Sequence, residues 1–225
     1  MSDHQNEHQL HNEKFQRERI ALFSDAVFAI AITLLVIEIQ PPELHGGHTA
    51  DSKLVNWLLG NMQRFFGFFV SFWVIGLYWM AHHRLFRFVV HSNSKLLTNN
   101  LLFLMPIVIM PFSTAFLTEF WLEDVHTPLV LYTTNIALSG LLSFRLWRIV
   151  ASPKNKLSQG MDALVVEYNL TRALFTPSLF VILMILSFFN RWIVWVVPPL
   201  IPVFMHFVKR HYKKKYPQLW AYHNF

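Results

Sequence analysis

The polar side chains with the clearest capacity for chemistry lie in an otherwise apolar segment, Arg19–Pro42. Asp25 is the only charged residue between Arg19 and Glu38, and Ser24 precedes it directly. A carboxylate at membrane depth is costly unless a partner group balances its charge. Asp25 could therefore be an ion or proton site, or it could belong to a buried polar clasp that fixes this segment against its neighbours. We favour the clasp, because Arg19 supplies a countercharge and Ser24 supplies a further hydrogen bond.

Arg19 and Asp25 do not share one face of a helix, because their spacing of i to i+6 carries them round to different sides. We therefore expect each to find partners on other helices. Adjacent histidines such as His82 and His83 can indicate zinc, but they point in different directions on a helix and have no cysteine or carboxylate close in sequence. We predict hydrogen bonding to the clasp and no metal site, and a histidine there could make the behaviour sensitive to pH. The candidate partners at the same depth lie in the stretch Tyr78–Arg84, which includes Trp79, His82 and His83, and at Asn99 and Asn100.

A stripe of three residues, Ile30, Thr33 and Ile37, continues along the same segment. Their spacing of i, i+3 and i+7 puts them on one face of a helix. This pattern is typical of ordinary helix packing. It would equally suit a pore lining, in which isoleucines from symmetric copies form dry rings with a hydroxyl ring between them. Periodicity alone favours packing.

The composition predicts an all-α membrane protein that crosses the bilayer several times. Of its 225 residues 54% are hydrophobic and 14% charged, whereas a soluble domain carries about 25% charged residues. The chain has no cysteine, which excludes disulfides, thiolate metal ligands and cysteine nucleophiles. It contains no P-loop, GxSxG or HExxH motif, so we expect neither an enzyme nor a cofactor.

Six apolar segments are each predicted to form a helix long enough for a bilayer core of about 30 Å. With six spans both termini lie on one side, together with every lysine and arginine except Lys53, Arg64 and Arg191. The positive-inside rule then places both termini in the cytoplasm. The predicted spans are Ile20–Ile37, Leu54–Met80, Leu96–Phe120, Leu129–Val150, a fifth from Met161 to Phe189, and, after a turn at Asn190–Arg191, Trp192–Val208.

The polar ends of the chain are predicted to lie outside this membrane region. Residues 1–16 are expected to form a polar cytoplasmic tail without regular structure. Residues 17–210 form the six-helix transmembrane domain. Residues 211–225 form a basic, aromatic cytoplasmic tail suited to a membrane surface.

The RxxxFSD pattern of Arg19, Phe23, Ser24 and Asp25 resembles the signature of the lysosomal potassium channel family named transmembrane protein 175. A single six-span unit of this length is similar to the prokaryotic members of that family. The stretches Trp79–His83 and Asn100–Phe112 also look familial, although less specifically. The resemblance covers roughly residues 16–210 and neither tail.

The resemblance implies a non-enzymatic, potassium-permeable cation channel without a carbonyl filter, with K⁺ as the permeant ion. It implies a homotetramer around the first helix, so the partners are further copies of the chain, the lipid bilayer and potassium ions, with no role for nucleic acid. Residues 17–210 are then the channel domain, in the plasma membrane if the protein is prokaryotic. The implied pore constriction is Ile30 and Ile37, and the implied selectivity position is Thr33. The implied structural polar network is Arg19, Phe23, Ser24, Asp25, Trp79, His82 and Asn100.

Two other classes of function compete with a channel. One is a proton-coupled secondary transporter that uses Asp25 and the nearby histidines His82 and His83 as carriers. The two three-span halves show no internal repeat, which argues against this reading. The other is a membrane-embedded enzyme or an assembly scaffold, and the lack of clustered acids and histidines at one depth argues against an enzyme.

Overall fold

The computed structural model describes residues 2–42, 51–123, 125–189 and 197–217. In these ranges the secondary structure is helical, apart from one isolated bridge that pairs Val89 with Ser158 between two loops. The helices are α1 (Ser2–Ile37), α2 (Asp51–Gly60), α3 (Met62–Phe86), α4 (Ser94–Glu119), α5 (Thr127–Ala151), the short 3₁₀ helix η1 (Pro153–Asn155), α6 (Ala163–Ser187) and α7 (Val197–Lys215).

Five of these helices are long and apolar enough to cross a membrane: Glu13–Ile37 within α1, and α3, α4, α5 and α6 over their full lengths. They agree with the first five predicted spans in number and order. The predicted turn at Asn190–Arg191 and the start of the sixth span lie outside the described residues. The described part of that span belongs to α7, a shorter helix that runs on to Lys215.

Two local predictions about helix boundaries are wrong. Residues 2–16 are helical rather than irregular, because α1 begins at Ser2. Its polar turns contact the α3–α4 loop, where Arg17 Nη1 donates to the Val89 carbonyl at 3.0 Å and Ser92 Oγ donates to Gln16 Oε1 at 3.3 Å. The second predicted span is two helices, since Asn61 has non-helical backbone angles and its side chain donates to the Trp57 carbonyl at the end of α2. Tertiary contacts and this side-chain cap were not visible in the hydrophobic pattern.

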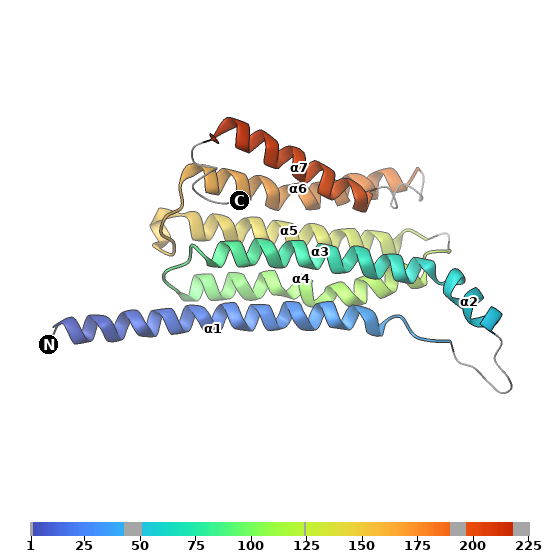
Figure 1. Ribbon diagram of the computed structural model, residues 1–225, viewed down its shortest axis with the longest axis horizontal. Helices are drawn as coiled ribbons and strands as arrows, with labels where there is room; N and C mark the ends of the chain where they lie inside the picture. The colour runs from blue at the N-terminus through green and yellow to red at the C-terminus, as the bar shows by residue number, and fades with distance from the viewer. Residues whose placement is uncertain (1, 43–50, 124, 190–196, 218–225) are drawn as a thin grey trace.

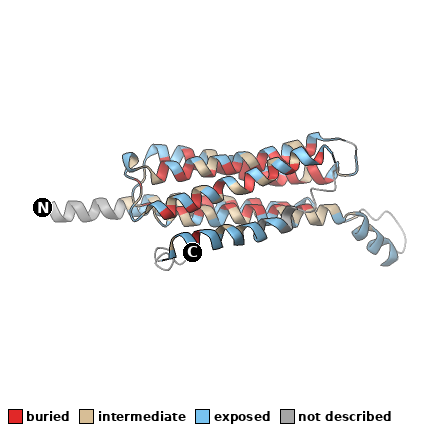
Figure 2. Ribbon diagram, turned by 90° about the horizontal axis from the view of Figure 1, so that it is seen from above, coloured by how far each residue is buried: buried red, intermediate tan, exposed pale blue. Residues whose placement is uncertain are grey.

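The helices form a row in which α4 lies between α1 and α5, and α5 lies between α4 and α6 (Figure 1). Helix α3 packs against α1, α4 and α5, and α1 occupies the edge of the row. The buried residues follow the helix sides that face one another (Figure 2). They include Ile75, Phe103, Ile107, Ile136 and Trp147, each at most 1% exposed. Because α1 is an edge helix, one of its sides stays uncovered in the single chain.

Helices α5 and α6 approach each other closely at Gly140. A Cβ atom added at Gly140 would lie 2.3 Å from Pro177 Cγ, which is closer than real atoms approach. Small residues of this kind allow helix backbones to come together in membranes. Gly140 therefore permits the contact that brings α6, with its internal proline, against α5.

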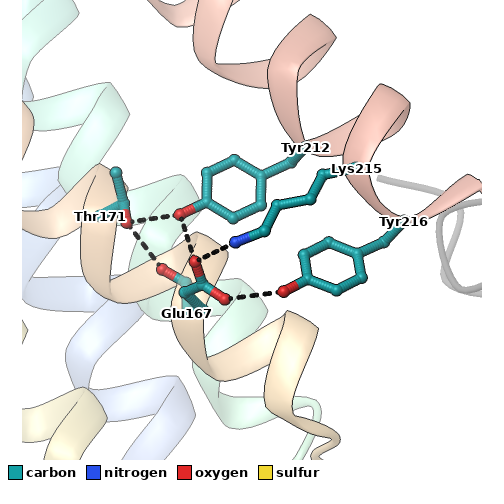
Figure 3. Close-up of polar contacts among 5 residues, drawn as sticks. All are labelled: Glu167, Thr171, Tyr212, Lys215 and Tyr216. Carbon is teal, nitrogen blue, oxygen red and sulfur yellow. Dashed lines mark hydrogen bonds and ion pairs between the residues drawn. The ribbon is translucent and has the colours of Figure 1, made fainter.

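Helix α7 is attached to α6 by a polar cluster around Glu167 (Figure 3). The Glu167 carboxylate accepts hydrogen bonds from Lys215 Nζ at 3.0 Å, Tyr216 OH at 3.2 Å and Tyr212 OH at 3.3 Å. The Tyr212 and Thr171 hydroxyls lie 2.9 Å apart. The hydrogen bond that Lys215 donates to the Glu167 carboxylate raises the pKa of Lys215 above its ordinary value. This cluster holds the basic end of α7 near the start of α6.

Candidate functional site

Helix α1 has one side packed into the subunit and one side left open. The packed side consists of Ser24, Phe28, Ala31 and Leu35, each at most 2% exposed. These residues recur at i, i+4, i+7 and i+11, which is one continuous helix face directed at α3 and α4. The helix is therefore fixed in rotation by its contacts with the rest of the subunit.

The open side carries the predicted stripe. Ile30 is 58% exposed and Ile37 is 64% exposed, and Thr33 is also exposed. The Thr33 hydroxyl donates to the Ile30 carbonyl at 2.9 Å. Because its proton is used within the helix, the exposed hydroxyl of Thr33 is left to act as an acceptor through the lone pairs of its oxygen. We call Ile30, Thr33 and Ile37 the exposed stripe.

Three of the predicted polar residues meet in a buried chain of hydrogen bonds. Asn100 Nδ2 donates to Ser24 Oγ at 2.8 Å, and the Ser24 hydroxyl donates to the Ile20 carbonyl at 2.8 Å. The Asn100 amide oxygen lies 2.8 Å from His82 Nε2. Because an amide oxygen only accepts, His82 donates through Nε2. One asparagine of α4 thus joins α1 to α3.

Aromatic rings enclose the histidine of this chain. The His82 ring stacks on Phe86 with centroids 4.4 Å apart and on Phe103 at 5.7 Å. Phe28 of α1 lies 5.8 Å from the same ring. His82 is 3% exposed. Its apolar surroundings and its hydrogen bond to Asn100 suit a structural role in holding α1, α3 and α4 together.

Asp25 has a partner on another helix, and that partner is one of the candidates named from the sequence. Trp79 Nε1 donates to Asp25 Oδ1 at 2.9 Å, at the edge of the buried network. Among the residues that the structure describes, Arg19 forms no ion pair with Asp25, and its guanidinium lies 5.7 Å from the centroid of the Phe15 ring. The countercharge expected from Arg19 is not supplied within the subunit. The continuous path of α1 carries Arg19 and Asp25 to different sides of the helix.

Three other predicted residues stay outside the network. Phe23 is 53% exposed on the open side of α1. His83 is exposed and its ring lies 5.8 Å from that of Trp79. Asn99 bonds within its own helix, to the Lys95 carbonyl. No group of three or more histidine, cysteine, aspartate or glutamate residues occurs among the described residues, so nothing in that part of the chain is arranged as a multi-ligand metal site.

A second polar network across α3, α4 and α5 was missed in the sequence. Ser71 Oγ lies 2.7 Å from Thr114 Oγ1 and 2.9 Å from Tyr132 OH, all buried. Tyr78 OH donates to the Ile136 carbonyl at 2.8 Å. Isolated hydroxyl residues inside apolar spans were the available signal, since such groups bond across helices in membranes.

A cavity lies where α1 and α4 end and α3 begins. It measures about 390 Å³ and is lined by Glu38, Gln40, Arg64 and Glu119 among others. Arg64 and Glu119 form an ion pair across it. Acidic residues beside an opening raise the local concentration of cations.

Five membrane-length helices packed around buried polar networks define an all-α, multi-pass integral membrane protein. Residues 19–111 match a family model described as "Endosomal/lysosomal potassium channel TMEM175". A protein of Chamaesiphon minutus, named a potassium channel, is 34% identical over 182 residues, which cover 80% of this chain and 89% of that protein. The chain belongs to the TMEM175 family, which is a family of channels and not of enzymes.

Further comparisons agree with this membership. A Streptomyces collinus protein named a potassium channel is 36% identical over 131 residues, covering 57% of this chain and 62% of that protein. A crystal structure described as a lysosomal potassium-selective channel TMEM175 homolog from Chamaesiphon minutus superposes with a TM-score of 0.70 at 29% identity, covering 85% of this chain and 97% of that one. A Gallus gallus protein named an endosomal/lysosomal proton channel is 28% identical over 60% of this chain but only 28% of its own length. The family expected from RxxxFSD is confirmed.

Proposed function

We propose that this chain forms a potassium-permeable cation channel, as a homotetramer with α1 of each copy around the pore. The observation that carries the proposal is the exposed stripe, which lies on the side of α1 that the subunit leaves uncovered. Uncovered apolar side chains in a membrane protein can face lipid or further copies of the same chain. The bacterial relatives named potassium channels favour the second arrangement.

In this proposal Ile30 and Ile37 each form a four-membered apolar ring. A narrow apolar ring excludes water because its walls offer no oxygen to replace the hydration shell of an ion. Thr33 forms a hydroxyl ring between them. Its oxygen faces outward with its proton already bonded to the Ile30 carbonyl, so it can replace part of the water around K⁺. Selectivity then depends on side-chain oxygens and needs no carbonyl filter.

The buried network is the part that keeps the stripe turned to the axis. Ser24, Asn100 and His82 fix the rotation of α1 against α3 and α4, and the Trp79–Asp25 hydrogen bond adds a second connection. Arg19 and Phe23 lie on open parts of α1. We assign them to contacts with a neighbouring copy, where a charged and an aromatic side chain can still find partners.

Single-channel recording in planar bilayers tests the proposal, with Ile30→Asn and Thr33→Ala as the central variants. Ile30→Asn should raise conductance or leak severalfold, because the amide hydrates the constriction. Thr33→Ala should mainly reduce the preference for K⁺ over Na⁺. Val36→Asn is the matched control, because Val36 is 53% exposed on α1 but lies outside the stripe. It should leave both properties close to those of the unmodified protein.

The competing transporter makes a different prediction for the same preparation. Transport coupled to protons would give slow, pH-gradient-driven flux and no unitary currents. Unchanged conductance and selectivity in both Ile30→Asn and Thr33→Ala would exclude α1 as the pore lining. A proton gradient in the bilayer assay also measures whether H⁺ permeates, which the name of the Gallus gallus relative makes worth testing.

A further inference from the structure

A small cavity away from the exposed stripe contains two arginine side chains. Arg84 of α3 and Arg172 of α6 line it, together with Tyr78, Ser143 and Asn169, and α7 contributes to its wall. Its volume is about 30 Å³, enough for a water molecule or a small ion. We call it the arginine cavity. Helix α3 lines it with Leu77, Tyr78, Ala81 and Arg84, whereas the side chains of α3 that contact Asp25 and Phe28 of α1 are Trp79 and His82.

The positive charges in the arginine cavity have no carboxylate partner among the described residues. Arg172 Nη1 donates to Tyr168 OH at 3.2 Å, and its guanidinium lies 5.3 Å from the centroid of that ring. Arg84 has no hydrogen bond or ion pair within the described part of the chain. The Nε atoms of Arg84 and Arg172 are both buried without an acceptor. Among the described residues, the arginines Arg172 and Arg87 lie close enough to Arg84 to repel its charge.

The acidic residues nearest to Arg172 in the sequence, Glu167 and Asp162, already have other partners. Glu167, five residues before Arg172, accepts hydrogen bonds from Lys215, Tyr212 and Tyr216. Asp162 caps the start of α6 through the Val165 amide. Two like charges that lose water without a counter-charge are strongly unfavourable. The missing negative charge must therefore come from outside the described chain.

We propose that the arginine cavity binds an anion between the guanidinium groups of Arg84 and Arg172. The ligand accepts charge-assisted N–H hydrogen bonds, for which guanidinium groups are well suited. It comes from one of two sources, a small inorganic anion such as chloride or phosphate, or the phosphate of a lipid headgroup. The bound anion ties α3 to α6 close to α7. His82 lies two residues before Arg84 on α3 and takes part in the network that positions α1. An anion bound at Arg84 therefore stabilises α3, the helix that carries His82.

Thermal unfolding of the purified protein in neutral detergent tests this site. The reference is sodium gluconate at constant ionic strength, and the arms are sodium chloride, sodium phosphate, and phosphatidylglycerol against phosphatidylcholine. At least one anion should raise Tm saturably, by about 2–4 °C. A rise with chloride or phosphate identifies a free anion. A rise with phosphatidylglycerol alone identifies a headgroup.

The variants separate a bound anion from general salt effects. Arg84→Met should abolish the anion-dependent rise, whereas Arg145→Met, which removes an exposed arginine of α5, should keep it. Arg172→Glu should also lose anion dependence while keeping its stability, because the carboxylate pairs with Arg84 internally. The proposal fails if the unmodified protein has the same Tm in every arm. It also fails if Arg84→Met raises Tm equally in all salts, which is the result expected for an unpaired buried charge with no anion.

Discussion

Asn100 connects three helices through a single amide group. Its nitrogen donates to Ser24 of α1 and its oxygen accepts from His82 of α3, while its own backbone belongs to α4. All three side chains are at most 3% exposed. A buried polar group costs free energy when it has no hydrogen-bond partner. Loss of the Asn100 side chain would therefore destabilise the fold through the buried partners it leaves behind as well as through its own hydrogen bonds.

Replacing Asn100 by alanine should destabilise the subunit by about 2 kcal/mol, because it leaves the His82 N–H without an acceptor. The measurement is Tm of the purified protein. Asn99→Ala is the matched control, since the neighbouring side chain bonds only within α4 and has an unpartnered oxygen. Equal losses in the two variants would show that the connection between helices contributes nothing of its own.

The partner of Asp25 can be tested in the same way. Trp79→Phe keeps the ring but removes the donor to the carboxylate, and hydrogen bonds to charged groups contribute about 1.5–3 kcal/mol. We expect a loss near the lower value, since the contact lies at the edge of the buried region. Arg19→Gln should change the stability of the subunit much less. A larger loss for Arg19→Gln in dissociated subunits would restore Arg19 as the counter-charge of Asp25.

At the scale of helices, the contact between α5 and α6 depends on the absence of a side chain. Gly140→Ala should destabilise the protein by about 1–3 kcal/mol, because the new Cβ would clash with the rigid Pro177 ring. The control is Gly76→Ala in α3, where the added carbon meets no atom within 4 Å beyond its chain neighbours and its own helix backbone. That variant should be neutral or more stable, by up to about 1 kcal/mol, since alanine favours helix. Thermal unfolding measures both, and a neutral Gly140→Ala would mean that α6 can move away from α5 at no cost.

The two sides of α1 illustrate why an edge helix needs a second partner. The packed side, with Phe28 and Leu35, secures the helix to α3 and α4. The open side presents exposed apolar residues, among them Ile30 and Ile37. In the proposed tetramer these two sides have separate tasks, folding of the subunit and formation of the pore.

For the whole molecule, the proposed arrangement is six spans with both termini in the cytoplasm. The chain has no cysteine, so single cysteines can be introduced and labelled without background. Thr49→Cys should react with a membrane-impermeant maleimide only from the outside, and Lys154→Cys only from the cytoplasm. The basis is the charge segregation, in which Lys53, Arg64 and Arg191 alone fall on the outer side. Labelling of Thr49→Cys from the cytoplasmic side would overturn this topology.

The sequence by itself determined that this is an all-α, multi-pass membrane protein, and it located the first five long apolar helices. It also indicated the family. Apolar length is a local property that bilayer thickness selects directly, so it can be read without knowing any contact. The RxxxFSD pattern is local as well, and the family it indicated is the one to which the chain belongs. The spacing of the exposed stripe also needed only the helix period, although not the knowledge that this side is uncovered.

Tertiary structure alone decided which polar groups meet. Ser24 and Asn100 are 76 residues apart, and Asp25 and Trp79 are 54 apart, so their pairing depends on how packed helices are rotated and shifted against one another. The same dependence explains why Asp25 bonds to Trp79 among its several candidate partners, and why Arg84 and Arg172 were not expected to share a cavity. Local pattern specifies that a polar side chain inside a membrane needs a partner. The register of neighbouring helices decides which partner it finds, because a rotation of one residue moves a side chain by about 100°.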